Sequence, residues 1–405
     1  MGVITKYIKN ENFHTTLINF IYQFKCETRE LAALTILCRL LSKTNRKYSE
    51  IDLFAREKMN RYIMSYEVMS QSINDLFFIN VSLLIPSKDV VKEDYLENAL
   101  NFCLDSIYDN NLENDIVLER EKKLCIEIQL NNYKNIDFLA EKNMLNLIDE
   151  EGIINKSKFK DIDYLSRLTK EDIINCFDKY IKNIKPKIFI NGNIDKEKTE
   201  KTISNYFEPL SLKDYKISKD YNYYYDKDIF IDKTEVSKFY QSIVYMVYCV
   251  KNYKEEDFYK LHLINMLLNN SSSDLLLKSL RKENSLVYHC GSSIMIRNGL
   301  LFVKAVTNAN NIKLAKMIIE SVINDIKQGK VNKENIDNIF HRLSLNIERE
   351  KDNFYITSSK VINDYFETDF DSEKVLKILK NITLTDLMEC ANRLEIKCIY
   401  TLEGR

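Results

Sequence analysis

The amino-acid sequence predicts an α+β protein made of two homologous domains, and three observations support that fold class. Segments with apolar residues at helical spacing alternate with short, densely apolar runs that are typical of strands. The same order of segments returns after about 220 residues in this chain of 405 residues. Hydrophobic residues make up 45% of the chain, enough for separate cores, whereas only 7 residues are Gly and 3 are Pro. This composition excludes collagen-like proteins and argues against a glycine-rich nucleotide-binding fold.

The first half opens with a densely apolar run and then alternates between the two patterns. TTLINFIYQF predicts a strand over 15–24, and the strongly apolar segment after it predicts a helix over 28–42. Ser49 is a typical N-cap residue and opens a predicted helix over 49–64. The next apolar run, which a proline ends, predicts a strand over 76–85.

The remainder of the first half contains further helices and a closing strand. Apolar residues fall on one face of the segment 92–108, which predicts an amphipathic helix. Helices are also predicted over 114–131 and 137–148, and another opens at the cap residue Thr169. KIFING predicts a strand over 187–192.

The second half repeats this order. An apolar run predicts a strand over 239–250, and helices are predicted over 254–269 and 273–283. VYHCGSSIMI and LLFVKAVT predict a hairpin. The half is completed by helices over 310–328 and 333–350, a helix that begins at Leu384-Thr385, and a strand in KCIYTLEG.

The two halves match with an offset that changes slowly along the chain. The offset decreases from about 225 residues at the first strand to about 212 at the last glycine, as small insertions and deletions would produce. We therefore predict an internal duplication; chance similarity between alternating elements is the alternative. A stretch rich in Lys, Asp and Tyr lacks helical spacing and predicts a linker. The predicted domains are 1–210 and 236–405, joined by a linker over 211–235.

Charge and cysteine content limit the partners and the compartment. The 59 basic and 60 acidic residues give a net charge of −1, so we expect no nucleic-acid or anionic-membrane partner. No apolar run approaches the roughly 20 residues of a membrane span, and the N-terminus MGVITKYIKN lacks the apolar stretch of a secretory signal. The 9 Cys are scattered without a C-x-x-C pair, which is typical of buried, reduced thiols. We therefore expect a cytoplasmic protein.

Two segments resemble functional segments of a known family. LEREKKLCIEIQLNNYKN resembles the Glu-x-x-x-x-x-Glu helix of the insulinase/pitrilysin-like zinc peptidases, and LLLKSLRKENSLVYHCGSS resembles their Leu-Arg-Glu-Lys-x-Gly-Leu-Ala-Tyr segment. FYQSIVYMVY and FINGNID are similar to that family's Gln-Ser strand and Gly-Asp-Ile turn. FHTTLINFIYQF is most similar to the small bacterial branch, whose members often work in pairs. The resemblance covers essentially the whole chain and implies two homologous α/β-sandwich domains, each with an antiparallel-rich sheet covered by helices.

The resemblance also implies where a zinc site should be. In the family, His-x-x-Glu-His on a helix supplies two zinc ligands and the general base, and a Glu on a later helix is the third ligand. The equivalent positions here are Thr35, Cys38 and Arg39, none of which can do this chemistry. Glu121 aligns with the third ligand, with Glu119 as the alternative. We interpret Glu121 as a solvated or ion-paired carboxylate, with a relic salt bridge to Arg39 as one alternative, and we expect no metal and no cofactor in this chain.

Arg281 and Tyr288 are the substrate-binding residues that the resemblance implies. In the family, such a pair lies in the second domain, positions the substrate backbone and supports the oxyanion that forms during peptide hydrolysis. Arg supplies a fixed charge and Tyr a hydroxyl donor. The alternative interpretation is a surface Arg and a half-buried strand Tyr. Ser285 stands where the family often has Gly, which raises a question about the turn between them.

These observations lead to one functional hypothesis and its rivals. We expect a non-catalytic subunit of a heterodimeric zinc-dependent peptidase, inactive by itself. A homologous partner with His-x-x-Glu-His would hold the zinc, and the pair would hydrolyse or mature a peptide substrate. The alternative is a non-enzymatic peptide-binding or scaffold protein derived from the same fold. A hydrolase with new chemistry is the third option, but no replacement catalytic set is visible in the sequence.

Overall fold

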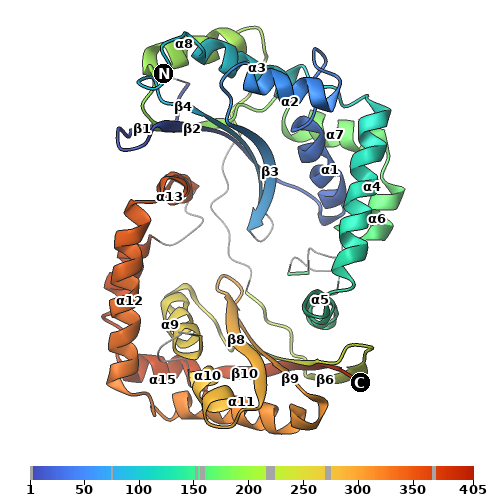
Figure 1. Cartoon of the computed structure of the whole chain (residues 1–405). Helices are drawn as coiled ribbons and strands as arrows, with labels where there is room; N and C mark the ends of the chain where they lie inside the picture. The colour runs from blue at the N-terminus through green and yellow to red at the C-terminus, as the bar shows by residue number, and fades with distance from the viewer. Residues whose placement is uncertain are drawn as a thin grey trace. The chain divides into compact units, whose positions relative to one another are not determined.

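The computed structural model describes residues 3–73, 76–150, 154–155, 160–215, 224–269, 275–366 and 371–405. The chain forms two compact units: unit 1 comprises Met1–Asn131 and Lys156–Lys219, and unit 2 comprises Asn132–Asn155 and Asp220–Arg405. Each unit contains one five-stranded sheet with helices packed against it (Figure 1).

The sheet of unit 1 is mixed and has the strand order β1-β5-β2-β4-β3. Its strands, in that order, are β1 (Lys6–Lys9), β5 (Lys187–Gly192), β2 (Thr15–Lys25), β4 (Leu76–Pro86) and β3 (Ser65–Ile73). β1 runs parallel to β5, whereas the other pairs are antiparallel. The central strands β2 and β4 carry the two apolar runs predicted from the sequence, and both are buried along most of their length.

The sheet of unit 2 has the same topology, with the strand order β6-β10-β7-β9-β8. Its strands, in that order, are β6 (Ile231–Val236), β10 (Leu394–Glu403), β7 (Ser242–Val250), β9 (Leu300–Thr307) and β8 (Val287–Met295). β6 runs parallel to β10, and the other pairs are antiparallel. Each strand thus has a counterpart in unit 1 at the same place in the sheet, and the predicted α+β class and duplication are confirmed.

Three strands at the sheet edges were not predicted: β1, β3 and β6. β3 and β6 are largely polar and are only partly buried, because an edge strand has one side exposed to water. Their sequences therefore lack the dense apolar runs that identify the central strands. β6 begins inside the predicted linker 211–235, so part of that linker is a strand. Residues 216–223 of the predicted linker, which include part of its tyrosine cluster, lie outside the described part of the chain.

The helices of unit 1 cover one face of its sheet (Figure 1). They are α1 (Leu31–Leu41), α2 (Ile51–Met59), α3 (Leu96–Tyr108), α4 (Asp115–Asn132), α6 (Ile162–Arg167), α7 (Lys170–Tyr180) and α8 (Lys196–Phe207). Their apolar sides bury a core against the sheet that includes Phe20 of β2, Leu37 of α1 and Leu100 of α3. Burying each such side chain contributes roughly 1.5–3 kcal/mol. α1 is buried on nearly all sides, as its strongly apolar sequence predicts.

The helices of unit 2 lie on both faces of its sheet. They are α5 (Ile136–Ile148), α9 (Phe258–Leu268), α10 (Leu275–Leu277), α11 (Ile312–Lys327), α12 (Lys333–Lys351), α13 (Phe354–Phe366), α14 (Ser372–Leu379) and α15 (Leu384–Asn392). α9, α10, α11 and α15 pack on one face and bury the main core of the unit. α13 and α14 were not predicted. The first two residues of the predicted helix 273–283 lie outside the described residues.

The same N-terminal cap begins α7 and α15, which are equivalent helices in the two units. Thr169 accepts a hydrogen bond from the backbone N–H of Asp172, whose carboxylate accepts one from the backbone N–H of Thr169. Thr383 and Asp386 repeat this arrangement. α15 begins at Leu384, as the sequence predicts, and Thr383 is its cap, because the Thr383 side chain reaches the third helical N–H.

α5 follows unit 1 helices in the sequence but packs in unit 2. Its buried face, with Ala140 and Met144, lies against the face of the sheet opposite α9, where it covers Tyr245 of β7 and Tyr400 of β10. The Asn143 side-chain amide donates to the Tyr400 hydroxyl at 3.0 Å, which fixes the helix on the sheet. The sequence analysis assigned this helix to the N-terminal domain 1–210. In the structure, Asn132–Asn155 belongs to unit 2 because its apolar face is buried there.

The cysteines have the environment that the sequence predicts. None of the 9 forms a disulfide, and each except Cys26 is buried. None of the helices in the described part of the chain has the length and apolarity of a membrane span.

Candidate functional site

The residues at the positions of the zinc motif lie on the buried helix α1. The Thr35 hydroxyl donates to the backbone oxygen of Leu31 at 2.7 Å, so it serves the helix backbone. Cys38 is buried, and this burial raises the pKa of its thiol from 9.0 to about 12. The thiol is therefore protonated at neutral pH and is neither a base nor a ready metal ligand.

Arg39 and Glu121 form an ion pair between α1 and α4. The Glu121 Oε2 atom accepts a hydrogen bond from Nε of Arg39 at 2.7 Å, and Nη2 of Arg39 lies 2.7 Å from the same oxygen as an ion-pair contact. The Glu121 side chain is 2% exposed and that of Arg39 is 31% exposed. Glu119, the alternative in the sequence analysis, is exposed and lies 3.4 Å from Lys122. The salt bridge that the sequence offered as one alternative is present, and Glu121 is its carboxylate.

These residues do not fit a zinc ion. The guanidinium of Arg39 is permanently charged and already bonded to Glu121, the one carboxylate aligned with a family ligand. In the ranges that the structure describes, no group of three or more His, Cys, Asp and Glu side chains could hold a metal ion. The arrangement stabilises the contact between α1 and α4, and it supplies no activated water.

Arg281 lies at the end of the helical segment that leads into β8. α10 continues into a π-helical turn, Lys278–Lys282, a conformation that is frequent at functional sites. Ser285 then adopts a left-handed conformation with φ of 53°. Its N–H donates to the Arg281 carbonyl at 2.9 Å and closes the turn. The Arg281 side chain is exposed, and no described residue forms an ion pair with it. The turn thus forms with Ser in a position that favours Gly.

Tyr288 lies at a β-bulge near the start of β8. The pairing of β8 with β9 shifts between Val287 and His289, which leaves Tyr288 as the extra residue. Bulges redirect side chains, and Tyr288 is 51% exposed. Its hydroxyl donates to Oδ1 of Asn308 at 2.8 Å, just beyond the end of β9. The bulge and the Asn308 contact hold the ring in an exposed orientation. Neither the bulge nor the contact with Asn308 follows from a local pattern in the sequence.

The structure places Arg281 and Tyr288 on consecutive elements of one unit. No interaction joins the two side chains among the residues described, and each faces solvent. Such groups are available to a ligand, with Arg as a charge-assisted donor and Tyr as a hydroxyl donor.

A cavity of about 380 Å³ lies in unit 2 between α5 and the strands β8 and β9. Tyr245 and Phe302 of the sheet and Met144 of α5 give it an apolar lining, and His289 lies at its β8 side. The sequence analysis missed this cavity because α5 comes from the first half of the chain. The one part of the cavity that the sequence indicated is the helix predicted over 137–148. The sheet on which this helix packs is distant in the sequence.

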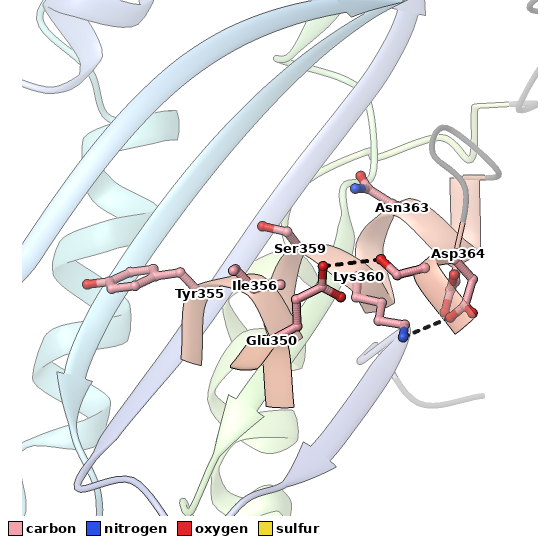
Figure 2. A pocket seen from close by; sticks show the side chains of 9 residues that line it. Glu350, Tyr355, Ile356, Ser359, Lys360, Asn363 and Asp364 are labelled. Atoms are coloured by element: carbon pink, nitrogen blue, oxygen red, sulfur yellow. Dashed lines mark hydrogen bonds and ion pairs between the residues drawn. The ribbon is translucent and has the colours of Figure 1, made fainter. Parts of the chain in front are cut away.

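A second cavity of about 240 Å³ lies among α12, α13 and α14 (Figure 2). Four of its polar side chains form two pairs. Lys360 lies 2.9 Å from Asp371, and the Ser372 hydroxyl donates to Glu350 at 3.2 Å. The hydrogen bond between Lys360 and Asp371 raises the pKa of the amine and lowers that of the carboxyl group. These interactions stabilise the junction of the helices.

Comparisons with known proteins support the fold and part of the family resemblance. The family model described as the Peptidase M16 inactive domain matches residues 167–343, which is less than half of the chain. No curated protein matches the chain in sequence. Solved structures, in contrast, match along nearly its whole length.

Three of these structures illustrate the similarity. A conserved protein from Enterococcus faecalis V583 is 17% identical, with a TM-score of 0.88 over 98% of this chain and 96% of that chain. A protease from Helicobacter pylori is 15% identical, with a TM-score of 0.77 over 98% and 96% of the two chains. A peptidase M16 inactive domain from Pseudomonas fluorescens is 10% identical, with a TM-score of 0.77 over 98% and 95%. At these identities the structures show that the chain has an M16-peptidase-like fold.

Proposed function

We propose that this chain is a non-catalytic subunit of a zinc-dependent peptidase and binds peptide together with a homologous, zinc-bearing partner. It would be inactive by itself. Arg281 and Tyr288 would contribute substrate-binding and oxyanion-supporting groups, and the partner would contribute the His-x-x-Glu-His motif. A reduced, cytoplasmic setting accords with cysteines that form no disulfide.

The ion pair between Arg39 and Glu121 is the observation that carries this proposal. It fills the position of the family's metal site with a fixed positive charge that is bonded to the remaining acidic residue. Arg281 and Tyr288, in contrast, keep exposed polar groups. An M16-like chain that lacks zinc chemistry yet presents such groups is suited to support catalysis in another subunit.

The expected contribution of the pair follows from its chemistry. A developing oxyanion is stabilised by donors held in place before the reaction, and loss of one donor slows turnover by about 10²–10³ in well-studied enzymes. The Tyr288 ring is already oriented by the bulge and by Asn308. Its hydroxyl must turn from Asn308 toward the substrate, so we expect a reduction of about a hundredfold for Tyr288→Phe. Arg281→Ala removes a charge as well as a donor and should reduce turnover further.

The test uses the chain co-expressed with a His-x-x-Glu-His homologue encoded next to it. The complex should be isolated by co-purification, and peptide cleavage should be compared for the unmodified complex, Tyr288→Phe and Arg281→Ala. Lys282→Ala serves as a matched control, since it removes the neighbouring exposed charge of the same turn. We expect all complexes to assemble and the first two variants alone to lose activity. If both cleave at the unmodified rate, the pair has no catalytic role and the proposal is wrong.

Peptide binding without cleavage is the second candidate function. The cavity between α5 and β8 favours it, because an apolar, partly enclosed site binds a ligand whether or not a zinc subunit is present. This function needs neither Arg281 nor Tyr288. A chain that binds peptide alone, and whose neighbouring genes encode no His-x-x-Glu-His homologue, would be explained by this candidate.

A further inference from the structure

The cavity beside α5 has an apolar lining that is built entirely within unit 2. Tyr245 from β7, Phe302 from β9, and Met144 and Leu145 from α5 are each buried and line it. With about 380 Å³, it lies near the lower end of the roughly 300–1,000 Å³ of ligand pockets, and one long side chain would fill much of it. The cavity therefore has the dimensions of a single side-chain subsite.

A glycine on β8 keeps this cavity open. Successive residues of a strand point to opposite faces, and Cys290 packs in the core on the face opposite α5. Gly291 therefore lies on the α5 side, between His289 and Ser293. Its φ lies outside the left-handed region, and a Cβ there would meet only the tip of the Asn269 side chain, at 3.2 Å. The backbone does not require glycine at this position, so its effect is to leave space in the cavity.

The charges around the cavity are unequal. Lys304 is held by Asp137 at 2.5 Å, so its charge is already compensated. Glu141, on the same side of α5, lines the cavity and forms no ion pair with any described residue. Burial raises the pKa of Tyr245, and the nearby Glu141 and Asp137 carboxylates add to this effect. Glu141 and Tyr245 line the same cavity, and Glu141 gives it a negative charge that no described cation pairs with.

We infer that this cavity is a subsite for a Lys or Arg side chain of a bound peptide, and that Glu141 selects the positive charge. The methylene stem of such a side chain would lie against Met144 and Leu145, as the stems of basic residues commonly do on apolar surfaces. Its cation would meet the Glu141 carboxylate and the ring faces of Tyr245 and Phe302. The inference rests on the proposed function only in taking a peptide as the ligand.

The test measures binding of synthetic peptides to the purified full chain, without a partner, by fluorescence anisotropy. The peptides are short, unstructured and identical except for one central residue, which is Arg, norleucine or Glu. Norleucine supplies the stem without the charge. We expect the Arg peptide to bind about fivefold more tightly than the norleucine peptide, as a partly exposed ion pair provides. The Glu peptide should bind most weakly.

Variants of the cavity identify the residue that selects the charge. Glu141→Gln should remove the preference for Arg over norleucine, and Glu141→Lys should shift the preference to the Glu peptide. Gly291→Val should weaken binding of the Arg and norleucine peptides by about tenfold, because it fills the space for the stem. Glu389→Gln is the matched control: it removes an exposed carboxylate of α15, away from the cavity, and should change nothing.

Each remaining outcome overturns the inference. Equal binding of Arg and norleucine peptides, an Arg preference that survives Glu141→Gln, or no binding of any peptide would each do so. Folding of Gly291→Val is checked by circular dichroism. Glu141→Gln replaces an exposed side chain, so it tests the inference even if Gly291→Val misfolds. Failure of the proposed function is distinguishable: it shows as a complex that cleaves equally well without Arg281 and Tyr288, while the Arg preference of the lone chain is measured independently.

Discussion

Replacement of Arg39 by Ala should destabilise unit 1, because it leaves the buried Glu121 carboxylate without its cation. The two side chains hold α1 to α4 through a hydrogen bond and an ion-pair contact, each of 2.7 Å, to one carboxylate oxygen. A charged group that is removed from water needs such partners, and an unpaired one is costly. The loss should therefore exceed that of an ordinary surface ion pair.

The magnitude follows from the burial of each partner. Removing one member of a buried ion pair costs about 3–5 kcal/mol. Glu121 is 2% exposed, but Arg39 is 31% exposed, so water can enter the space that the guanidinium leaves. We therefore expect a loss of about 2–3 kcal/mol. In a unit of this size, 1 kcal/mol corresponds to roughly 2–4 °C, so the midpoint of thermal unfolding should fall by about 5–10 °C.

The assay is urea and thermal unfolding of the full chain, followed by circular dichroism, with hydrogen exchange to locate the loss. A chain of two units need not unfold in one step, so the first transition is compared between variants. Faster exchange should be confined to α1 and α4. Lys123→Ala is the matched control, since Lys123 forms an exposed pair with Glu127 at 4.0 Å on α4, and it should change stability by less than about 0.5 kcal/mol.

A paired replacement separates loss of the charge pair from loss of packing. Arg39→Met together with Glu121→Leu keeps similar volumes and removes both charges, and it should lie within about 1 kcal/mol of the unmodified chain. Two results would show that the pair does not hold α1 to α4. In the first, Arg39→Ala loses no more stability than Lys123→Ala. In the second, the double variant is less stable than Arg39→Met alone.

Three further predictions concern the metal, the turn and the thiols. The purified chain should contain no stoichiometric zinc by elemental analysis, because Arg39 occupies the ligand position; about one tightly held zinc per chain, lost in Glu121→Ala, would contradict this. Ser285→Gly should raise stability by about 1 kcal/mol in urea unfolding, because glycine adopts a φ of 53° without strain; a destabilised variant would show that the Ser285 side chain has a structural role. Burial raises the pKa of Cys38 from 9.0 to about 12, so its contribution to stability is complete below pH 9 and is lost as the pH rises toward 12. A thiol reagent at pH 8 should accordingly modify the native chain only at Cys26, and Cys26→Ser should abolish the reaction.

The central part of each sheet could be predicted because burial on both sides leaves a dense apolar run. β2, β4 and β7 are of this kind, and each was identified from the sequence. The edge strands β1, β3 and β6 were not, because water satisfies one of their edges and their side chains are free to be polar. Helices α13 and α14 were also missed. A local sequence pattern therefore predicts a central strand, whereas formation of an edge strand depends on the neighbouring strand with which it pairs.

The candidate site divides in the same way. The ion pair of Arg39 with Glu121 was one of the interpretations that the sequence offered, because the family resemblance aligned both residues with the zinc site. Only the structure shows that the carboxylate is buried and therefore needs a cation. The exposed positions of Arg281 and Tyr288 accord with their expected use, although their role stays a prediction. The bulge at Tyr288 and its bond to Asn308 depend on the register of β8 against β9, which no local pattern specifies.

The sequence by itself determined the α+β class and the duplication, since each depends on residue type and order along the chain. Tertiary structure alone decided that α5 leaves the half of the chain that encodes it and packs in unit 2. The helix is amphipathic, and its pattern states that one face must be buried without stating against which sheet. Packing beside Tyr245 and Phe302 fixes α5 on the sheet of unit 2. Glu141 therefore lines a cavity whose other walls lie more than a hundred residues away along the chain.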